Sequence, residues 1–158
     1  MGAWKIARIA AGILAGDADA NECATREFGS PLKVFLDGIG TEWPKNNLDR
    51  FPYALLTPAQ TQGGNGSDRH TVRAVVAVHA GGTGDASKGR EEEDGVRAVG
   101  KGEFLEELVS RVRRAVMDGH PGSVPDSFQA DFDLVNQYPV QSAELTFEFE
   151  DQFAFDNP

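Results

Sequence analysis

The segment Ser142–Asp151, SAELTFEFED, alternates small or apolar residues with polar ones. Successive side chains of a β-strand point to opposite faces, so this period of two predicts a strand and argues against a helix. One face would carry Ala143, Leu145, Phe147 and Phe149, and the other Glu144, Thr146, Glu148 and Glu150. Any fold must therefore bury the first face and leave three carboxylates on a face that is solvated or lines a wet space.

Two other segments have helical spacing. Residues 3–16, AWKIARIAAGILAG, predict a short helix that stops at Gly16. Residues 103–119, EFLEELVSRVRRAVMDG, predict a second helix with one apolar stripe. Glutamates occupy its start and arginines its end, which complements the helix dipole. The stripe consists of Phe104, Leu105, Leu108, Val109, Val112, Ala115 and Val116.

Four further strands are expected. They lie near Leu32–Leu36, in Phe51–Leu56 with Pro58 as its end, in Arg69–Ala80, and around Gln129–Val135. The second and third would form a hairpin whose connection, QTQGGNGSD, is too long for a tight turn. Residues 16–30 and 81–100 are predicted to be linking loops.

Together these segments predict one α+β domain spanning residues 1–158. We expect a mostly antiparallel sheet of four to five strands, two helices packed on one face, and long mobile loops. The chain has 158 residues with 40% hydrophobic and 25% charged residues, which suits one globular domain.

The net charge of −10 argues against tight, non-specific binding to nucleic acid, which needs Lys and Arg to replace counterions. An acidic wall would repel phosphates and leave DNA free to move past it. The lone cysteine, Cys23, can form neither an intramolecular disulfide nor a Cys-rich zinc site. No segment is apolar over a length that would span a membrane.

The stretch Val75–Gly95, VVAVHAGGTGDASKGREEEDG, raises the possibility of a phosphate-binding loop. Lys88 follows Ser87 and precedes Gly89, so the order that a P-loop requires is absent. Ser87 occupies the place of the third glycine of a dinucleotide fingerprint, and the acids that follow would repel a phosphate. We therefore expect a mobile loop here, with a small-ligand site using the glycines after residue 80 as an alternative.

Other chemical sites are not expected. His70, His79 and His120 lack the spacing of metal ligands, and structural or surface roles are favoured for all three. The acidic run around Asp17 and Asp19 lacks the glycine and distal glutamate of a calcium loop. No catalytic signature surrounds Cys23 or any serine, so we predict neither an enzyme nor a cofactor. Trp4 and Trp43 are either partner-binding anchors or core residues.

The order of the elements, with Phe51-Pro52 at one strand and Ala143-Glu144-Leu145-Thr146 at the last, resembles the tail terminator proteins. These are the tail-completion, head–tail joining proteins of long-tailed bacteriophages and prophages, including that of phage lambda. The similarity in element order extends from about Ala3 to Glu150, and the matching residues are structural.

The resemblance implies a structural virion assembly protein that forms a ring, usually a hexamer. The ring would cap the tail tube, end its polymerisation and provide the surface onto which the head docks, with tail tube and connector proteins as partners. DNA would pass through the lumen without specific binding. The protein would be found in the tail or neck of the virion, and in the cytoplasm of the bacterial host during assembly. Another neck or tail-tube component is an alternative, and so is a monomeric ligand-binding domain.

Overall fold

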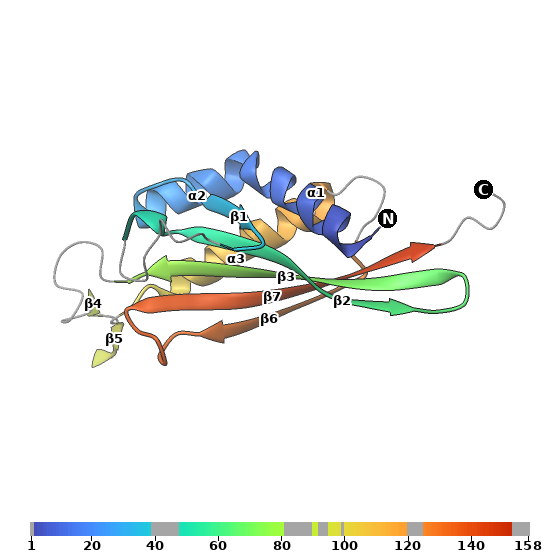
Figure 1. The fold of residues 1–158 in the computed structure, drawn as a ribbon. Helices are drawn as coiled ribbons and strands as arrows, with labels where there is room; N and C mark the ends of the chain where they lie inside the picture. The colour runs from blue at the N-terminus through green and yellow to red at the C-terminus, as the bar shows by residue number, and fades with distance from the viewer. Residues whose placement is uncertain are drawn as a thin grey trace.

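A computed structural model describes residues 2–38, 48–80, 90–91, 95–98, 100–119 and 125–152. Within these ranges the chain has an α+β fold (Figure 1). The helices are α1 (Ala3–Ala15), α2 (Ala18–Phe28), α3 (Gly102–Gly119) and the 3-10 helix η1 (Leu48–Arg50). The strands are β1 (Lys33–Leu36), β2 (Tyr53–Gly63), β3 (Ser67–His79), β4 (Arg90–Glu91), β5 (Arg97–Ala98), β6 (Ser127–Asp133) and β7 (Val140–Gln152).

The main sheet has five strands in the order β1-β2-β3-β7-β6. All neighbouring pairs are antiparallel except β1–β2, so the sheet is mixed rather than purely antiparallel. The β2–β3 hairpin and the end of β7 extend past the helices at one end of the sheet (Figure 1). The alternation in Ser142–Asp151 predicted β7 correctly, because the side chains at 143, 145, 147 and 149 are buried.

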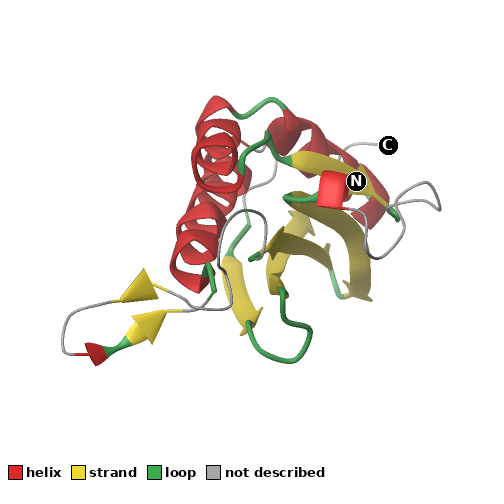
Figure 2. Ribbon diagram, turned by 90° about the vertical axis from the view of Figure 1, so that its left-hand side faces the viewer, coloured by secondary structure: helices red, strands yellow, loops and turns green. Residues whose placement is uncertain are grey.

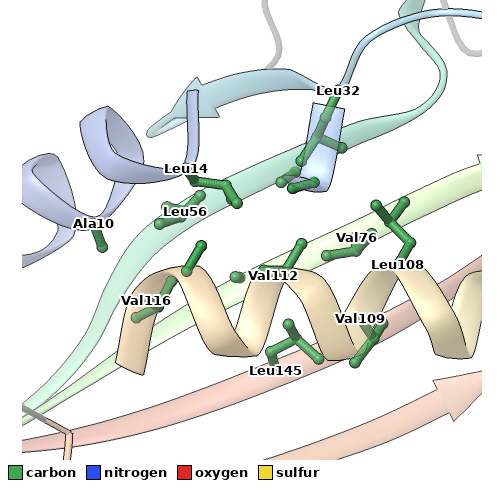
Figure 3. Close-up of a cluster of buried hydrophobic side chains, with 14 of the residues drawn as sticks. Ala10, Leu14, Leu32, Leu56, Val76, Leu108, Val109, Val112, Val116 and Leu145 are labelled. Atoms are coloured by element: carbon green, nitrogen blue, oxygen red, sulfur yellow. The ribbon is translucent and has the colours of Figure 1, made fainter. Parts of the chain in front are cut away.

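The helices cover one face of the sheet (Figures 1 and 2). The amphipathic helix α3 lies over β3 and β7, and α1 lies over β1, β2 and β3. Figure 3 shows Leu108, Val112 and Val116 of α3 pointing toward the strands, into a core that also contains Leu14 and Leu145. The predicted stripe of α3 is buried except for Phe104, which is partly exposed. This apolar layer fixes which face of every strand is the inner one.

The described residues form three α-helices where two were predicted, since α2 occupies the expected linker 16–30. Asp17 caps α2, its Oδ2 accepting a hydrogen bond of 2.8 Å from the backbone N–H of Ala20. Gly29 ends the helix with a φ of +89°, in the left-handed region that favours glycine. The helix buries only Ala20, Cys23 and Ala24, mainly against α3, so its apolar signal is weak.

The predicted end of β2 at Pro58 is also wrong, because the strand continues to Gly63. Pro58 lies beyond Leu56, the last residue of β2 that pairs with β1, and beside a β-bulge between Pro58 and Gln60. An edge position next to a bulge tolerates the missing N–H of proline. The connection to β3 is then only residues 64–66, and the N–H of Gly64 bonds to the carbonyl of Ser67 at 2.9 Å. The hairpin turn is therefore tight.

The predicted loop 81–100 contains the two short strands β4 and β5, which form a separate ladder away from the main sheet. The predicted mobility of this segment rests largely on residues 81–89 and 92–94, which lie outside the described residues. The strand predicted around Gln129–Val135 is observed two residues earlier, as β6. It ends where Asp133 Oδ1 accepts a hydrogen bond of 3.1 Å from the N–H of Asn136, at the turn into β7.

We expect Leu145→Ala to lower the free energy of unfolding by about 2–5 kcal/mol, because it leaves a cavity in the core. Leu145 is fully buried between β7 and α3. Its neighbour Glu144 is half-exposed on the opposite face, so Glu144→Ala should change stability by about 0.5 kcal/mol or less. Urea unfolding measures both, and equal losses would contradict the assignment of the inner face.

We expect Asp17→Ala to cost about 0.5–2 kcal/mol, because the cap satisfies a free N–H at the start of α2. Glu22→Ala on the same helix serves as the control: its carboxylate is 74% exposed and 3.8 Å from Arg26, so the change should be close to neutral. Urea unfolding with circular dichroism measures both. A neutral Asp17→Ala would contradict the capping role.

Candidate functional site

Over β6 and β7, the face of the sheet opposite the helices is polar and only partly buried. Glu144, Glu148 and Glu150 project from β7 on this face, next to Asp131 of β6. The odd-numbered residues of β7 from 143 to 149 are buried under the helices, so the even-numbered residues project from the opposite face. In the described part of the chain no α-helix contributes to this surface, which we call the open face.

Two arginines of β3 partly neutralise the open face. The Arg73 Nε lies 3.0 Å from Glu144 Oε1. The Arg69 Nη1 lies 2.9 Å from Asp126 Oδ1 and 3.3 Å from Glu148 Oε2, so one cation serves two carboxylates. These pairs are roughly half-exposed and contribute little stability in water. The two guanidinium groups of Arg69 and Arg73 thus lie among six carboxylates, namely Asp126, Asp131, Asp133, Glu144, Glu148 and Glu150.

A pocket of about 740 Å³ lies at the end of the open face where β7 begins. Arg50, Tyr53 and His79 line one side of it, and the turn of residues 136–139 lines the other. The Arg50 side chain is buried, its Cζ lying 4.6 Å from the centre of the Phe51 ring. The pocket therefore combines one buried guanidinium with aromatic rings and amide side chains.

His79 stands beside Arg50 in this pocket. Burial lowers the pKa of His79 below its ordinary value, and the nearby Arg50 charge lowers it further. The imidazole is therefore held in its neutral form to a lower pH than a solvated histidine. An adjoining hollow contains Lys33, whose pKa is lowered by burial and whose Nζ donates to Ser30 Oγ at 3.2 Å.

The residues considered as metal ligands or nucleophiles are not brought together. Among the described residues no three His, Cys, Asp or Glu side chains form a metal-ligand set. His70 is buried in the core, and its Nδ1 lies 3.0 Å from Thr61 Oγ1. His79 lies on the open face, and His120 falls outside the described residues. Burial raises the pKa of the Cys23 thiol, which disfavours a reactive thiolate.

The acidic run near the N-terminus has a structural role. Asp17 caps α2, and Asp19 pairs with Arg111 and Arg114, joining α2 to α3. These contacts account for both carboxylates without a calcium ion. Trp4 is 48% exposed on α1, so it is not a core residue, and Trp43 lies outside the described residues. The glycines considered as a phosphate loop, residues 81–89, also lie outside them.

Neither the pocket nor the exposed apolar side chains at the end of β6 and in the following turn were predicted from the sequence. Phe132, Val135 and Tyr138 are 43%, 80% and 41% exposed, and all three lie at the end of β6 or in the following turn. The pocket residues 50, 79 and 138 are far apart in sequence, so no local spacing could indicate them. Apolar residues in a turn segment were the signal available for these exposed side chains.

We expect stability to fall as the pH drops below about 6.5, the ordinary pKa of histidine, because the unfolded chain binds a proton there that native His79 resists. His79→Gln should reduce the difference in unfolding free energy between pH 7.5 and pH 5.5. Urea unfolding at the two pH values measures it. An unchanged pH difference in the variant would refute this role for His79.

Within the described residues, none of the helices is both long and apolar enough to cross a bilayer. Neither protein-family models nor curated proteins give a match to this chain.

Proposed function

We propose that this protein is a ring-forming virion assembly subunit that acts as a tail terminator of a bacteriophage or prophage. Its ring would cap the tail tube, stop tube polymerisation and present a surface to the head. The observation that carries the proposal is the open face, whose carboxylates on β6 and β7 outnumber the arginines beside them. The resemblance in element order from about Ala3 to Glu150 supports the same class.

The open face suits a channel wall through which DNA passes. Its carboxylates outnumber its guanidinium groups, and the whole chain has a net charge of −10. A wall of this kind repels phosphates and gives DNA no array of cations to hold it. The side chains also project from regular strands, so the wall would keep its shape as DNA moves past.

The described residues also favour a binding role over catalysis. The pocket at the end of the open face holds a buried arginine and a histidine whose pKa is lowered, and its described lining includes no cysteine, serine or carboxylate. Such a lining can bind a partner side chain but offers no activated nucleophile. Another neck or tail-tube component would use the same surfaces, and imaging on tail tubes separates that alternative from a terminator.

The test combines light scattering with electron microscopy. The purified protein, mixed with tail tubes assembled from the tube protein of the same genome, should form rings at one end of each tube and stop further growth. Particles located elsewhere in the neck or along the tube would favour the alternative component. A persistent monomer that never binds tubes would refute the proposal.

A matched pair of charge variants tests the role of the open face. Glu144→Lys with Glu150→Lys reverses two charges on the open face, while Glu106→Lys with Asp118→Lys makes the same change on exposed positions of α3. Both should form rings, but only the open-face variant should slow DNA passage, because its cations hold phosphates. Infection by particles carrying each variant measures the effect. Equal infectivity would refute the assignment of this face to the channel.

A further inference from the structure

The main sheet has two outer edges, and both remain unpaired over several residues in the described part of the chain. On one side, β1 pairs only with Tyr53–Leu56 of β2, which leaves the outer edge of β2 without a described strand from Thr57 to Gly63. On the other side, β6 pairs with β7 alone, so Ser127–Asp133 forms the opposite edge. An unpaired edge presents backbone N–H and C=O groups that can bind another strand.

The free edge of β2 has little of the usual protection against such pairing. The sequence from Thr57 to Gly63 is TPAQTQG, without a single charge. Natural edge strands are commonly protected by lysines, prolines or bulges. Here Pro58 and the bulge come at the start of the segment, so Gln60–Gly63 beyond them remains a regular, uncharged edge.

We propose that the outer edge of β2 at Gln60–Gly63 pairs with the outer edge of β6 from a second copy of this chain. The inference rests on the proposed ring and names the contact that builds it. The two edges belong to opposite sides of one sheet, so the contact is head-to-tail, which closes into a ring or continues as a filament.

Strand direction supports this pairing. Each neighbouring pair from β2 through β3 and β7 to β6 is antiparallel, so β6 runs opposite to β2. A rotation about an axis along the strands preserves these directions. The β6 strand of the next copy therefore meets β2 antiparallel, which is the more stable pairing.

Side chains at the two edges complement each other. Gln60 pairs with Thr71 and Gln62 with Arg69, which places both amides on the open face. Asp131 is on the open face of β6. The amides can donate hydrogen bonds to this carboxylate. A β2–β2 contact would instead allow only hydrogen bonds between uncharged amides.

The register leaves room for the second copy. Through the ladder, Ser127 is level with Gln60 and Asp133 with Tyr53. If the β6 strand of the second copy is shifted toward the hairpin turn by about four residues, its Asp133 lies level with Thr57 instead of Tyr53, and the strand lies past the end of β1. A stagger of this kind between strands is a requirement of tilted, closed sheets. The tip of the β2–β3 hairpin extends beyond the helices in Figure 1, so none of the described helices lies over it.

Two variants of the full chain test the pairing by light scattering and sedimentation. Gln60→Glu with Gln62→Glu faces Asp131 with like charges, so the dissociation constant of the oligomer should rise about tenfold. Gln60→Lys with Gln62→Lys faces Asp131 with opposite charges and should keep or tighten the oligomer. In a β2–β2 contact the lysines of the two copies would face each other as like charges. That contact therefore predicts that the lysine variant raises the dissociation constant of the oligomer.

Adding Asp131→Lys to the glutamate variant should restore assembly, and this rescue separates a direct contact from damage to the fold. If the oligomer is unchanged in all three variants, or is weakened by the lysines, the proposed pairing is wrong. Such a result would still be compatible with a ring that forms through another surface. Oligomers that follow the expected order but never cap tail tubes would instead support the pairing and refute the terminator function. A wild-type chain that stays monomeric at every concentration would overturn both.

Discussion

The one-sided burial of the sheet determines most of what this molecule can do. The inner face of β3 and β7, with Val76, Leu145 and Phe147 fully buried, packs against α1 and α3. Burying such side chains stabilises the fold by about 1.5–3 kcal/mol each. All three α-helices of the described residues are on that side, so within the described part of the chain no helix covers the opposite face, and part of β2 and all of β6 form free sheet edges.

The sequence predicted the elements whose apolar pattern spans a full face. The alternation in β7 and the stripe of α3 each bury several large side chains, so period and burial agree. Helix α2 was not predicted because its buried residues are small and its acidic residues are typical of a loop. Its signals were the caps, Asp17 and Gly29, rather than periodicity. The extension of β2 past Pro58 depends on a bulge and an edge position, which only the assembled sheet defines.

The candidate site was predictable only in part. The three carboxylates on the outer face of β7 follow directly from the alternation of its sequence. The pocket does not, because Arg50, His79 and Tyr138 meet only after η1, β3 and the turn before β7 are placed side by side. The free edges likewise follow from strand order, since a sequence does not show which strands end a sheet. In the described part of the chain, the strand order leaves part of β2 and all of β6 at the edges of the main sheet.

In the proposed assembly, the helices stabilise each subunit and the outer edges of the sheet join neighbouring subunits. Hydrogen–deuterium exchange of the protein at concentrations below and above assembly tests it most directly. We expect amides of Gln60–Gly63 and of β6 to gain protection on assembly, while those of α1 and α3 stay unchanged. Protection gained in α1 and α3, with both edges still exchanging as in the monomer, would show that the subunits associate through another surface.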